Sequence, residues 1–421
     1  MSQVQNTPGS LGKVEQERVP AFPRKSVPLW RNRDYMLLWS GQIVSSTGTR
    51  VSQLALPLLV LALTNSPAQA GLVGAMRGIP YALLILPAGA LVDRWNRKLV
   101  MILCDTGRAL ALGSIPLALL LGHLTLVQLY IVSLVEGTLF TFFNLSETAC
   151  LPQVVEKDQL AAAAAQNSII DSVSGMAGPS LGGIFYSIAR AVPFLTDAIT
   201  YCASVLSLFF IKKDFQEERE VKPLRLWAEI GEGLLWLWHA PLIRFIALLT
   251  GGLILPVAGY SLILIVLAQS QHASSFAIGL ILAAGGIGSI VGAMLVAPLQ
   301  RRFRFGQLMI AGTWLWGLTW LLFAVAPSPL MLGIAVAASF IVVPIYMSGQ
   351  FGYRLSVIPD QLQGRVNSVF RLIAFGSEPV SLALTGFLLQ AIGPTPTVLV
   401  MFVPQGILAV MATFSKHFRG K

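Results

Sequence analysis

Charged residues are scarce in this sequence, and their scarcity excludes a water-soluble globular chain. Asp, Glu, Lys and Arg make up 11% of the 421 residues, whereas hydrophobic residues make up 55%. Ordinary soluble domains carry about 25% charged residues, so this chain has too few charges to cover a surface that faces water. We therefore expect the excess apolar surface to face a lipid bilayer.

The sequence also lacks the residue patterns of a disulfide framework, a metal site or a nucleotide-binding loop. Cys104, Cys150 and Cys202 lie in apolar stretches without CxxC or Cys/His spacing, so neither disulfide bonds nor a bound metal is expected. No G-x-x-x-x-G-K-[ST] loop is present, which excludes ATP hydrolysis within this chain as the energy source. The four histidines are scattered, with no catalytic constellation. We predict that the protein is not an enzyme and uses no cofactor.

Long apolar runs dominate the chain, and each run of about 20 residues is long enough to cross a bilayer as a helix. We predict about twelve spans, at 36–63, 69–91, 99–121, 124–147, 168–188, 192–211, 243–268, 276–298, 306–326, 329–351, 367–392 and 396–415. Residues 1–35 are polar and lack the apolar core of a signal peptide, so we expect an N-terminal tail there. The expected fold is an all-α membrane protein.

The distribution of Lys and Arg between the spans predicts the orientation of the chain. Lys and Arg are concentrated in the tail and in every second connector. In the intervening connectors the only Lys or Arg is Arg190. Because such residues stay on the cytoplasmic side, we expect both termini in the cytoplasm and the chain in the cell (inner or plasma) membrane. The net charge of +10 then reflects loops that meet anionic lipid headgroups. No continuous basic face suits a nucleic acid.

A cytoplasmic linker over 212–240 is expected to separate two bundles, at 36–211 and 241–415, with a short cytoplasmic tail at 416–421. Apolar residues recur at helical spacing within the linker and predict an amphipathic helix on the membrane surface. These residues are Leu224, Trp227, Ile230, Leu234, Leu235 and Trp238.

Short sequence matches between the two halves indicate an internal repeat. Asn167 and Ser168 recur as Asn367 and Ser368, and Pro179 recurs as Pro379, each 200 residues later. A repeat of this length predicts two pseudo-symmetric six-helix bundles with a substrate path between them.

The segment GALVDRWNRK at 89–98 lies between the second and third spans, on the expected cytoplasmic side. It resembles the G-x-L-x-D-R-x-x-R-K/R loop signature of the major facilitator superfamily. The matching residues are Gly89, Leu91, Asp93, Arg94, Arg97 and Lys98. The resemblance implies a gating loop that holds the outward-facing state through a charge network. The alternative interpretation is a basic cytoplasmic turn without a gating role.

A second segment, GMAGPSLGG at 175–183, resembles the G-P-x-x-G-G motif that the same superfamily associates with antiporters. The residues concerned are Gly175, Gly178, Pro179, Gly182 and Gly183. Gly and Pro would also serve plain helix packing, which is the alternative interpretation. The fourth-helix arginine of many proton antiporters is absent, because Ser133 holds its place, with Glu136 beside it.

Segments 32–48, 54–81 and 363–368 look like the branch of this superfamily that contains macrolide, multidrug and enterobactin-type siderophore exporters. The resemblance covers about residues 30–415. It implies export of a hydrophobic or amphipathic small molecule by proton antiport with alternating access, usually as a monomer.

Three other functions are compatible with the residues. A facilitator or importer of a small metabolite would move its substrate without proton exchange. A non-transporting membrane receptor or scaffold would show no flux. A membrane-embedded enzyme would need a reactive cluster, which the sequence does not contain.

Charged residues inside the membrane are costly and therefore mark functional sites. The candidates for proton coupling or substrate binding are Glu136, Glu378, Arg50 and Asp197. Glu136 is the favoured proton carrier because of its depth within the predicted membrane span. The alternative is that Glu136 is a neutral or paired glutamate that stabilises helix contacts. Arg50 could hold an anionic substrate or a carboxylate, or extend from a helix end to the interface. Asp197 is expected near the outer end of its span, within reach of water. Asp105 and Arg108 are spaced to pair on one helical face.

Overall fold

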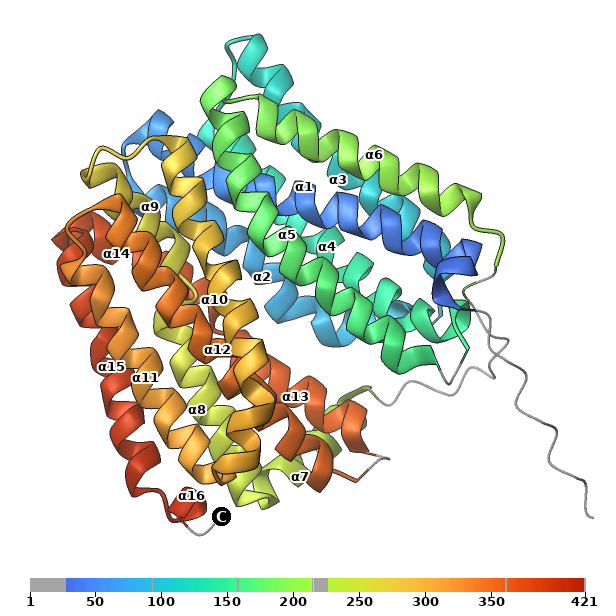
Figure 1. Cartoon of the computed structure of the whole chain (residues 1–421). Helices are drawn as coiled ribbons and strands as arrows, with labels where there is room; N and C mark the ends of the chain where they lie inside the picture. Colours follow the sequence, from blue (N-terminus) through green and yellow to red (C-terminus); the bar gives the residue numbers. More distant parts are fainter. Residues whose placement is uncertain are drawn as a thin grey trace, which may run out of the picture.

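The computed structural model describes residues 28–92, 94–156, 159–213, 215, 226–359 and 362–419. Helices and turns form this part of the chain, which contains no strand (Figure 1). The predicted all-α architecture is therefore confirmed. Most of the expected N-terminal tail lies outside the described residues, and the first long helix begins at Arg33.

The first six helices form an N-terminal bundle. They are α1 (Arg33–Thr64), α2 (Pro67–Val92), α3 (Arg97–Leu120), α4 (Leu126–Val154), α5 (Leu160–Ile188) and α6 (Val192–Phe210). Within this bundle α1 packs against α2, α5 and α6, and α3 packs against α4 and α6.

The remaining long helices form a C-terminal bundle. They are α8 (Pro241–Val257), α9 (Tyr260–Ser270), α10 (Ser275–Arg302), α11 (Phe305–Val325), α12 (Pro329–Val357), α13 (Gln363–Phe375), α14 (Glu378–Ile392) and α15 (Pro394–Phe414). The short helix α16 (Lys416–Arg419) follows them. Counted as membrane crossings, the two bundles give twelve spans in the described chain, because α8 and α9 share one span and α13 and α14 share another.

Polar side chains cap several of these helices where they begin. Asn32, Asn96, Thr125, Ser274 and Ser328 each accept a hydrogen bond from the backbone N–H three residues later. Such caps satisfy amide groups that the first turn of a helix leaves without a partner. The connectors in the sequence therefore set where these five spans start.

Two spans that the sequence predicts as continuous, 243–268 and 367–392, are interrupted in the structure. The first breaks between Val257 and Tyr260, just after Pro256. The second breaks between Phe375 and Glu378, just before Pro379. Each interruption lies beside a proline, which has no N–H to donate and strains the preceding turn, but Pro179 lies inside an unbroken helix, so the packing around each proline also decides where a helix breaks. Broken helices in a membrane protein are tolerated where neighbouring helices cover them.

Eleven spans among the described residues are long and apolar enough to cross a membrane on their own. The exception is α5, which has 29 residues but many small and polar side chains. It packs between α1 of its own bundle and α10 of the other, so two of its faces contact protein rather than lipid.

The linker helix α7 (Leu226–His239) packs against α13 and α8. Leu237 faces this contact and is buried, whereas Leu234, Leu235 and Trp238 are exposed. The side chains of Trp227 and Ile230, and all of Leu224, lie outside the described part of the chain. For the described turns, α7 presents one buried face and one exposed apolar face, the pattern of a helix at a membrane interface.

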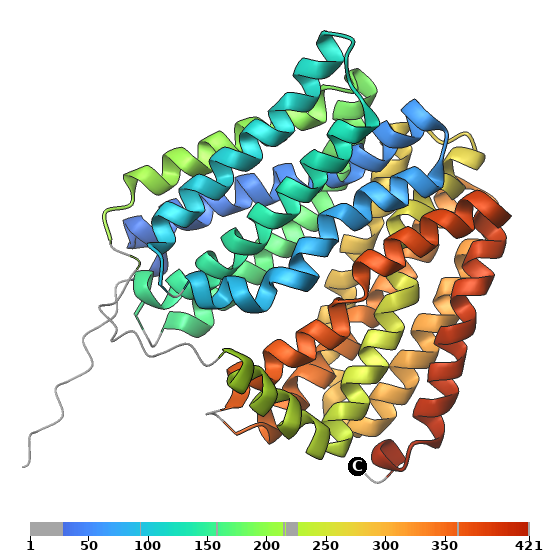
Figure 2. The same ribbon diagram turned by 180° about the vertical axis from the view of Figure 1, so that it is seen from behind.

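Among the described residues, the two bundles share a hydrophobic core at the side remote from the linker. One cluster of buried residues there joins Leu58 of α1 and Val73 of α2 to Leu264 of α9 and Val336 of α12. On the linker side each bundle has a core of its own. The core of the N-terminal bundle includes Met101, and the core of the C-terminal bundle is formed by residues of that bundle's own helices. The bundles therefore meet at the remote side and diverge toward the linker (Figures 1 and 2).

Equivalent residues of the two halves make the contacts between bundles. Pro179 of α5 lies against Gly279 of α10, and Pro379 of α14 lies against Gly78 of α2. Both contacts pair a proline of one half with a glycine of the other, as a two-fold relation requires. The predicted pseudo-symmetric pair of bundles is confirmed in this respect as well.

Candidate functional site

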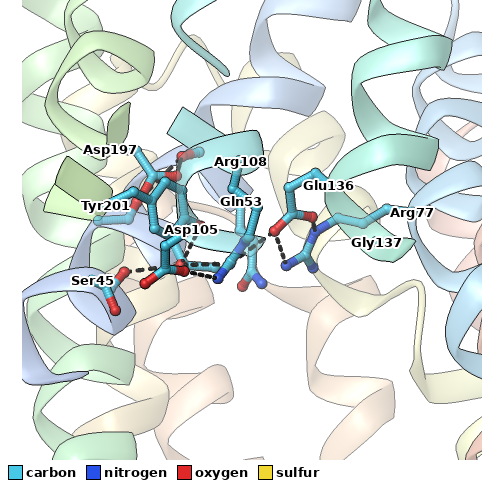
Figure 3. Close-up of polar contacts among 12 residues, drawn as sticks. Ser45, Gln53, Arg77, Asp105, Arg108, Glu136, Gly137, Asp197 and Tyr201 are labelled. Carbon is cyan, nitrogen blue, oxygen red and sulfur yellow. Dashed lines mark hydrogen bonds and ion pairs between the residues drawn. The ribbon is translucent and has the colours of Figure 1, made fainter. Parts of the chain in front are cut away.

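Four charged side chains from three helices of the N-terminal bundle form a continuous network (Figure 3). Arg77 of α2 pairs with Glu136 of α4 through Nε and, at 3.2 Å, through Nη2. Arg108 of α3 reaches the same Glu136 at 3.1 Å and pairs with Asp105 at 3.2 Å. Asp105, Arg108 and Glu136 are almost completely buried. The predicted pairing of Asp105 with Arg108 is confirmed.

A fifth charge, Asp197 of α6, lies beside this network and is fully buried. Its carboxylate accepts hydrogen bonds from the hydroxyls of Ser52 and Thr200. Arg108 lies over the ring of Tyr201, 4.1 Å from the centroid, one turn after Asp197. The sequence places Asp197 near the outer end of its span, within reach of water; in the structure α1 covers the carboxylate, which is shielded from bulk solvent and borders a small internal cavity.

Glycines let the helices approach closely enough to form the network. Gly137 of α4 lies against the backbone carbonyl of Arg77, and Gly48 of α1 lies against Asp197 and Thr200. A side chain at either position would push the helices apart, since small residues are what permits close backbone contact in membranes. The network thus depends on the α2–α4 and α1–α6 contacts.

A small cavity of about 30 Å³ lies inside this cluster. Its polar lining includes Gln53, Arg77, Glu136 and Asp197. A cavity needs roughly 10–15 Å³ to hold one water molecule, so this one has room for about two. Water there would connect Asp197 to Arg77 and Gln53.

Arg50 and Glu378 lie outside this network, at the boundary between the bundles. Arg50 is exposed, and its guanidinium donates a 3.2 Å hydrogen bond to Gln53. Glu378 opens α14 and is also exposed, and the next residue, Pro379, packs on Gly78 of α2, directly after Arg77. Arg50 and Glu378 therefore each face the opposite bundle, whereas Glu136 and Asp197 lie inside the N-terminal bundle.

Another contact crosses the boundary nearer the linker side. Arg371 of α13 donates a 2.7 Å hydrogen bond to the hydroxyl of Tyr81 on α2. Met176 of α5 still packs on Gly286 of α10, whereas Ser172, one turn closer to the linker side, is exposed. The opening between the bundles therefore begins close to Ser172.

The loop motif at 89–98 holds helix ends through backbone carbonyls. Arg97 donates to the carbonyl of Ala149 on α4 at 2.9 Å, and Lys98 donates to the carbonyl of Ile211 after α6 at 2.6 Å. Cations suit such positions because a helix C-terminus carries partial negative charge. Gly89 and Leu91 lie in the last turn of α2, and Arg94 is exposed. Asp93 lies outside the described residues.

The glycine motif at 175–183 has two contact faces. Gly178 and Gly182 lie against Arg50 and Val51 of α1, whereas Gly183 and the neighbouring Pro179 lie against α10. Gly175 faces open space. The motif thus joins two packing contacts, one within the bundle and one across the boundary.

Sequence reasoning missed the hydroxyl groups that complete the network. Thr49 accepts or donates a 2.7 Å hydrogen bond to Tyr201, and it also accepts one from Arg108 at 3.3 Å. Small and hydroxyl residues recur every three or four positions along α1, at Ser45, Gly48 and Ser52. That spacing marks one helix face and could have identified it. Among the described residues, no three His, Cys, Asp or Glu side chains converge on a possible metal site.

Comparison with known proteins gives matches over nearly the whole chain. A family model described as "Transmembrane secretion effector" matches residues 26–418. The multidrug efflux pump Tap of Mycolicibacterium fortuitum is 25% identical over 399 residues, which cover 91% of this chain and 96% of Tap. The enterobactin exporter EntS of Citrobacter koseri is 26% identical over 364 residues, 84% of each chain.

The fold also matches solved transporter structures. The crystal structure of a mutant of the nucleoside transporter NupG superposes with a TM-score of 0.74. The match covers 90% of this chain and all of that one, at 14% sequence identity. Similarity at this level of identity concerns the fold.

Proposed function

This chain belongs to the major facilitator superfamily of membrane transporters, and from that premise we propose that it exports hydrophobic or amphipathic small molecules in exchange for protons. The similarity to a multidrug efflux pump and to an enterobactin exporter supports export as the direction. The cargo class would then be a drug, a macrolide or a siderophore-like compound. A single copy of the chain contains both bundles and would act as a monomer in the cell membrane.

The proposed cycle begins from the arrangement that the bundles have here. With both termini in the cytoplasm, as the distribution of Lys and Arg favours, the linker side faces the cytoplasm. The shared core at the remote side then closes the path to the outside, and the opening near Ser172 admits cargo from the cytoplasm or the inner leaflet. Rocking of the bundles about their contact would reverse this access.

One observation carries the proposal of proton coupling: a buried charge network touches the boundary between the bundles. Arg77 is the member that does so, because its side chain is 25% exposed while its partner Glu136 is buried. Arg77 also precedes Gly78, which packs across the boundary on Pro379, the residue after Glu378. A change of charge inside the N-terminal bundle therefore alters the balance of charges between the bundles, which is what coupling requires.

The cargo site would lie between Arg50 of α1 and Glu378 of α14. Both side chains are exposed at the boundary, on helices that carry few other charges. A few charged groups in an apolar surrounding suit a bulky compound with one polar end.

A vesicle experiment tests this proposal. Inside-out vesicles that contain the protein would be given an acid interior and a pH-sensitive dye, and then macrolides, cationic dyes or catecholate siderophores. Export into the vesicle by antiport removes protons from the interior when a transported compound is added. Vesicles without the protein serve as the control, because any proton release that they show does not come from transport by this chain.

The outcomes separate the candidate functions. Proton release on addition of one compound, absent in the control, supports antiport and identifies the cargo class. Transport of a labelled compound without proton movement would favour a facilitator. No flux with any compound would favour a receptor or scaffold.

A further inference from the structure

The charges of the buried network do not cancel. Its carboxylates are Asp105, Glu136 and Asp197, and its guanidinium groups are Arg77 and Arg108. Arginine keeps its proton in proteins, so three ionised carboxylates against two guanidinium groups would leave one net negative charge. An uncompensated charge inside a membrane is strongly unfavourable. One bound proton removes it.

The contacts of the three carboxylates differ, and the difference indicates where that proton resides. Glu136 touches both arginines, and Asp105 touches Arg108. Asp197 forms no ion pair with the described part of the chain, and its carboxylate instead meets the hydroxyls of Ser52 and Thr200. A guanidinium stabilises the ionised form of the carboxylate that it touches, whereas a hydroxyl can donate to an ionised carboxylate or accept from a protonated one.

Every helix around Asp197 contributes to this environment. The charged or titratable groups that face it are Arg108 of α3, Glu136 of α4 and Tyr201 of its own helix. Helix α1 contributes Ser52 and the backbone at Gly48 but no charge to this contact. The proton-binding position is thus enclosed by one cation, one anion and hydroxyl groups.

The surroundings of Asp197 also connect it with the boundary between the bundles. It lies in the second turn of α6, at the end remote from the linker. The cavity of about 30 Å³ joins it to Gln53 and Arg77. Gln53 in turn accepts a hydrogen bond from Arg50, which is exposed at the boundary. Water in this cavity would give a proton on Asp197 a route toward Arg77 and the boundary between the bundles.

We propose that Asp197 carries the proton that the transporter exchanges for its cargo. This inference rests on the proposed antiport. Ser52, the hydroxyl that contacts Asp197, lies on α1 beside Gln53 and two residues from Arg50. Release of the proton makes the carboxylate an acceptor only, which fixes the Ser52 hydroxyl and this part of α1. A change in the protonation state of Asp197 thereby alters the contacts of α1, the helix that faces the cargo.

The test uses the full-length protein in proteoliposomes and compares Asp197→Asn with the wild type. Asparagine keeps the size and hydrogen-bonding capacity of the side chain but cannot release a proton. We expect Asp197→Asn to keep cargo-for-cargo exchange within about twofold of the wild type. We expect it to lose proton release on cargo addition and accumulation of cargo against its gradient. Glu156→Gln is the matched control: Glu156 is an exposed carboxylate just after α4, outside the network, and its replacement should preserve both activities.

A second variant tests the same inference if Asp197→Asn does not fold. Ser52→Ala removes one donor to the ionised carboxylate, so the proton is held more tightly and the pH profile of transport should shift to higher pH. Proton release by Asp197→Asn at the wild-type level would overturn the inference and leave antiport standing. Cargo movement by the wild type without any proton exchange would overturn both. An unshifted pH profile in Ser52→Ala would also count against Asp197.

Discussion

Glu136 is the residue on which both arginines of the network converge, so its replacement tests the network as a structural unit. We expect Glu136→Gln to lower the free energy of unfolding by about 3–5 kcal/mol, because it leaves Arg77 and Arg108 without their shared charge in a buried site. Thermal unfolding of the purified protein in detergent measures the change.

Glu147 supplies the matched control for this measurement. It lies on the same helix, and its carboxylate forms no hydrogen bond or ion pair among the described residues. Glu147→Gln should therefore change the stability by less than about 1 kcal/mol. Equal effects of the two substitutions would mean that the ion pairs do not hold α2, α3 and α4 together.

At this scale the sequence predicts which charges matter but not how they are paired. The cost of a charge inside the membrane marks Glu136, Asp197 and Arg50 from the sequence alone. One partner of Glu136 is Arg77, 59 residues away on another helix. Apolar runs give the depth of a residue in the membrane, whereas pairing also depends on how each helix is rotated, and tertiary packing sets that rotation.

At the scale of helices, the glycine motif of α5 allows a comparison within one segment. A Cβ at Gly178 would collide with the side chain of Arg50, whereas a Cβ at Gly175 would meet open space. We expect Gly178→Ala to separate α5 from α1 and to destabilise the protein by about 1–3 kcal/mol. Gly175→Ala should be neutral or slightly stabilising, because alanine favours the helix over glycine.

Thermal unfolding and transport should be measured for both alanine variants. The packing interpretation requires that Gly178→Ala impair both properties and Gly175→Ala neither. Loss of transport in Gly175→Ala, with unchanged stability, would instead assign the open position a direct role in the transport cycle.

The broken helices show where sequence reasoning about helices fails. Pro256 and Pro379 both lie within apolar runs long enough for one span, so hydropathy predicts two continuous helices. Proline does not by itself break a membrane helix: Pro179 lies inside the unbroken α5. The repeat relates Pro179 to Pro379, yet only the second marks an interruption. The difference arises from the neighbouring residues and the packing around each proline.

For the whole molecule, the number of spans and the division into two halves can be predicted from the sequence, because both depend on composition over long windows. The repeat identifies Pro179 and Pro379 but not their glycine partners, Gly78 and Gly279. Those partners come from the opposite half in each case. No periodicity within one helix reveals which helix of the other bundle it will meet.

The remaining prediction concerns the movement of the two bundles. Met176 of α5 packs on Gly286 of α10, and the same faces continue one turn further to Ser172 and Ile290, which are both exposed. Rocking that closes the linker side would bring these two positions together. In a Cys202→Ser background, which removes the exposed native thiol, we therefore expect Ser172→Cys and Ile290→Cys to form a disulfide several-fold faster during turnover than at rest.

Gel mobility under mild oxidation measures the rate of disulfide formation, and the two single-cysteine variants provide the control. A disulfide requires Cα atoms about 4.4–6.8 Å apart, so it forms only when the linker side is closed. Once formed it should arrest transport, and reduction should restore it, because the closed linker side cannot accept cargo. Equal rates at rest and during turnover, in a protein that still transports, would mean that the bundles do not rock about the α5–α10 contact.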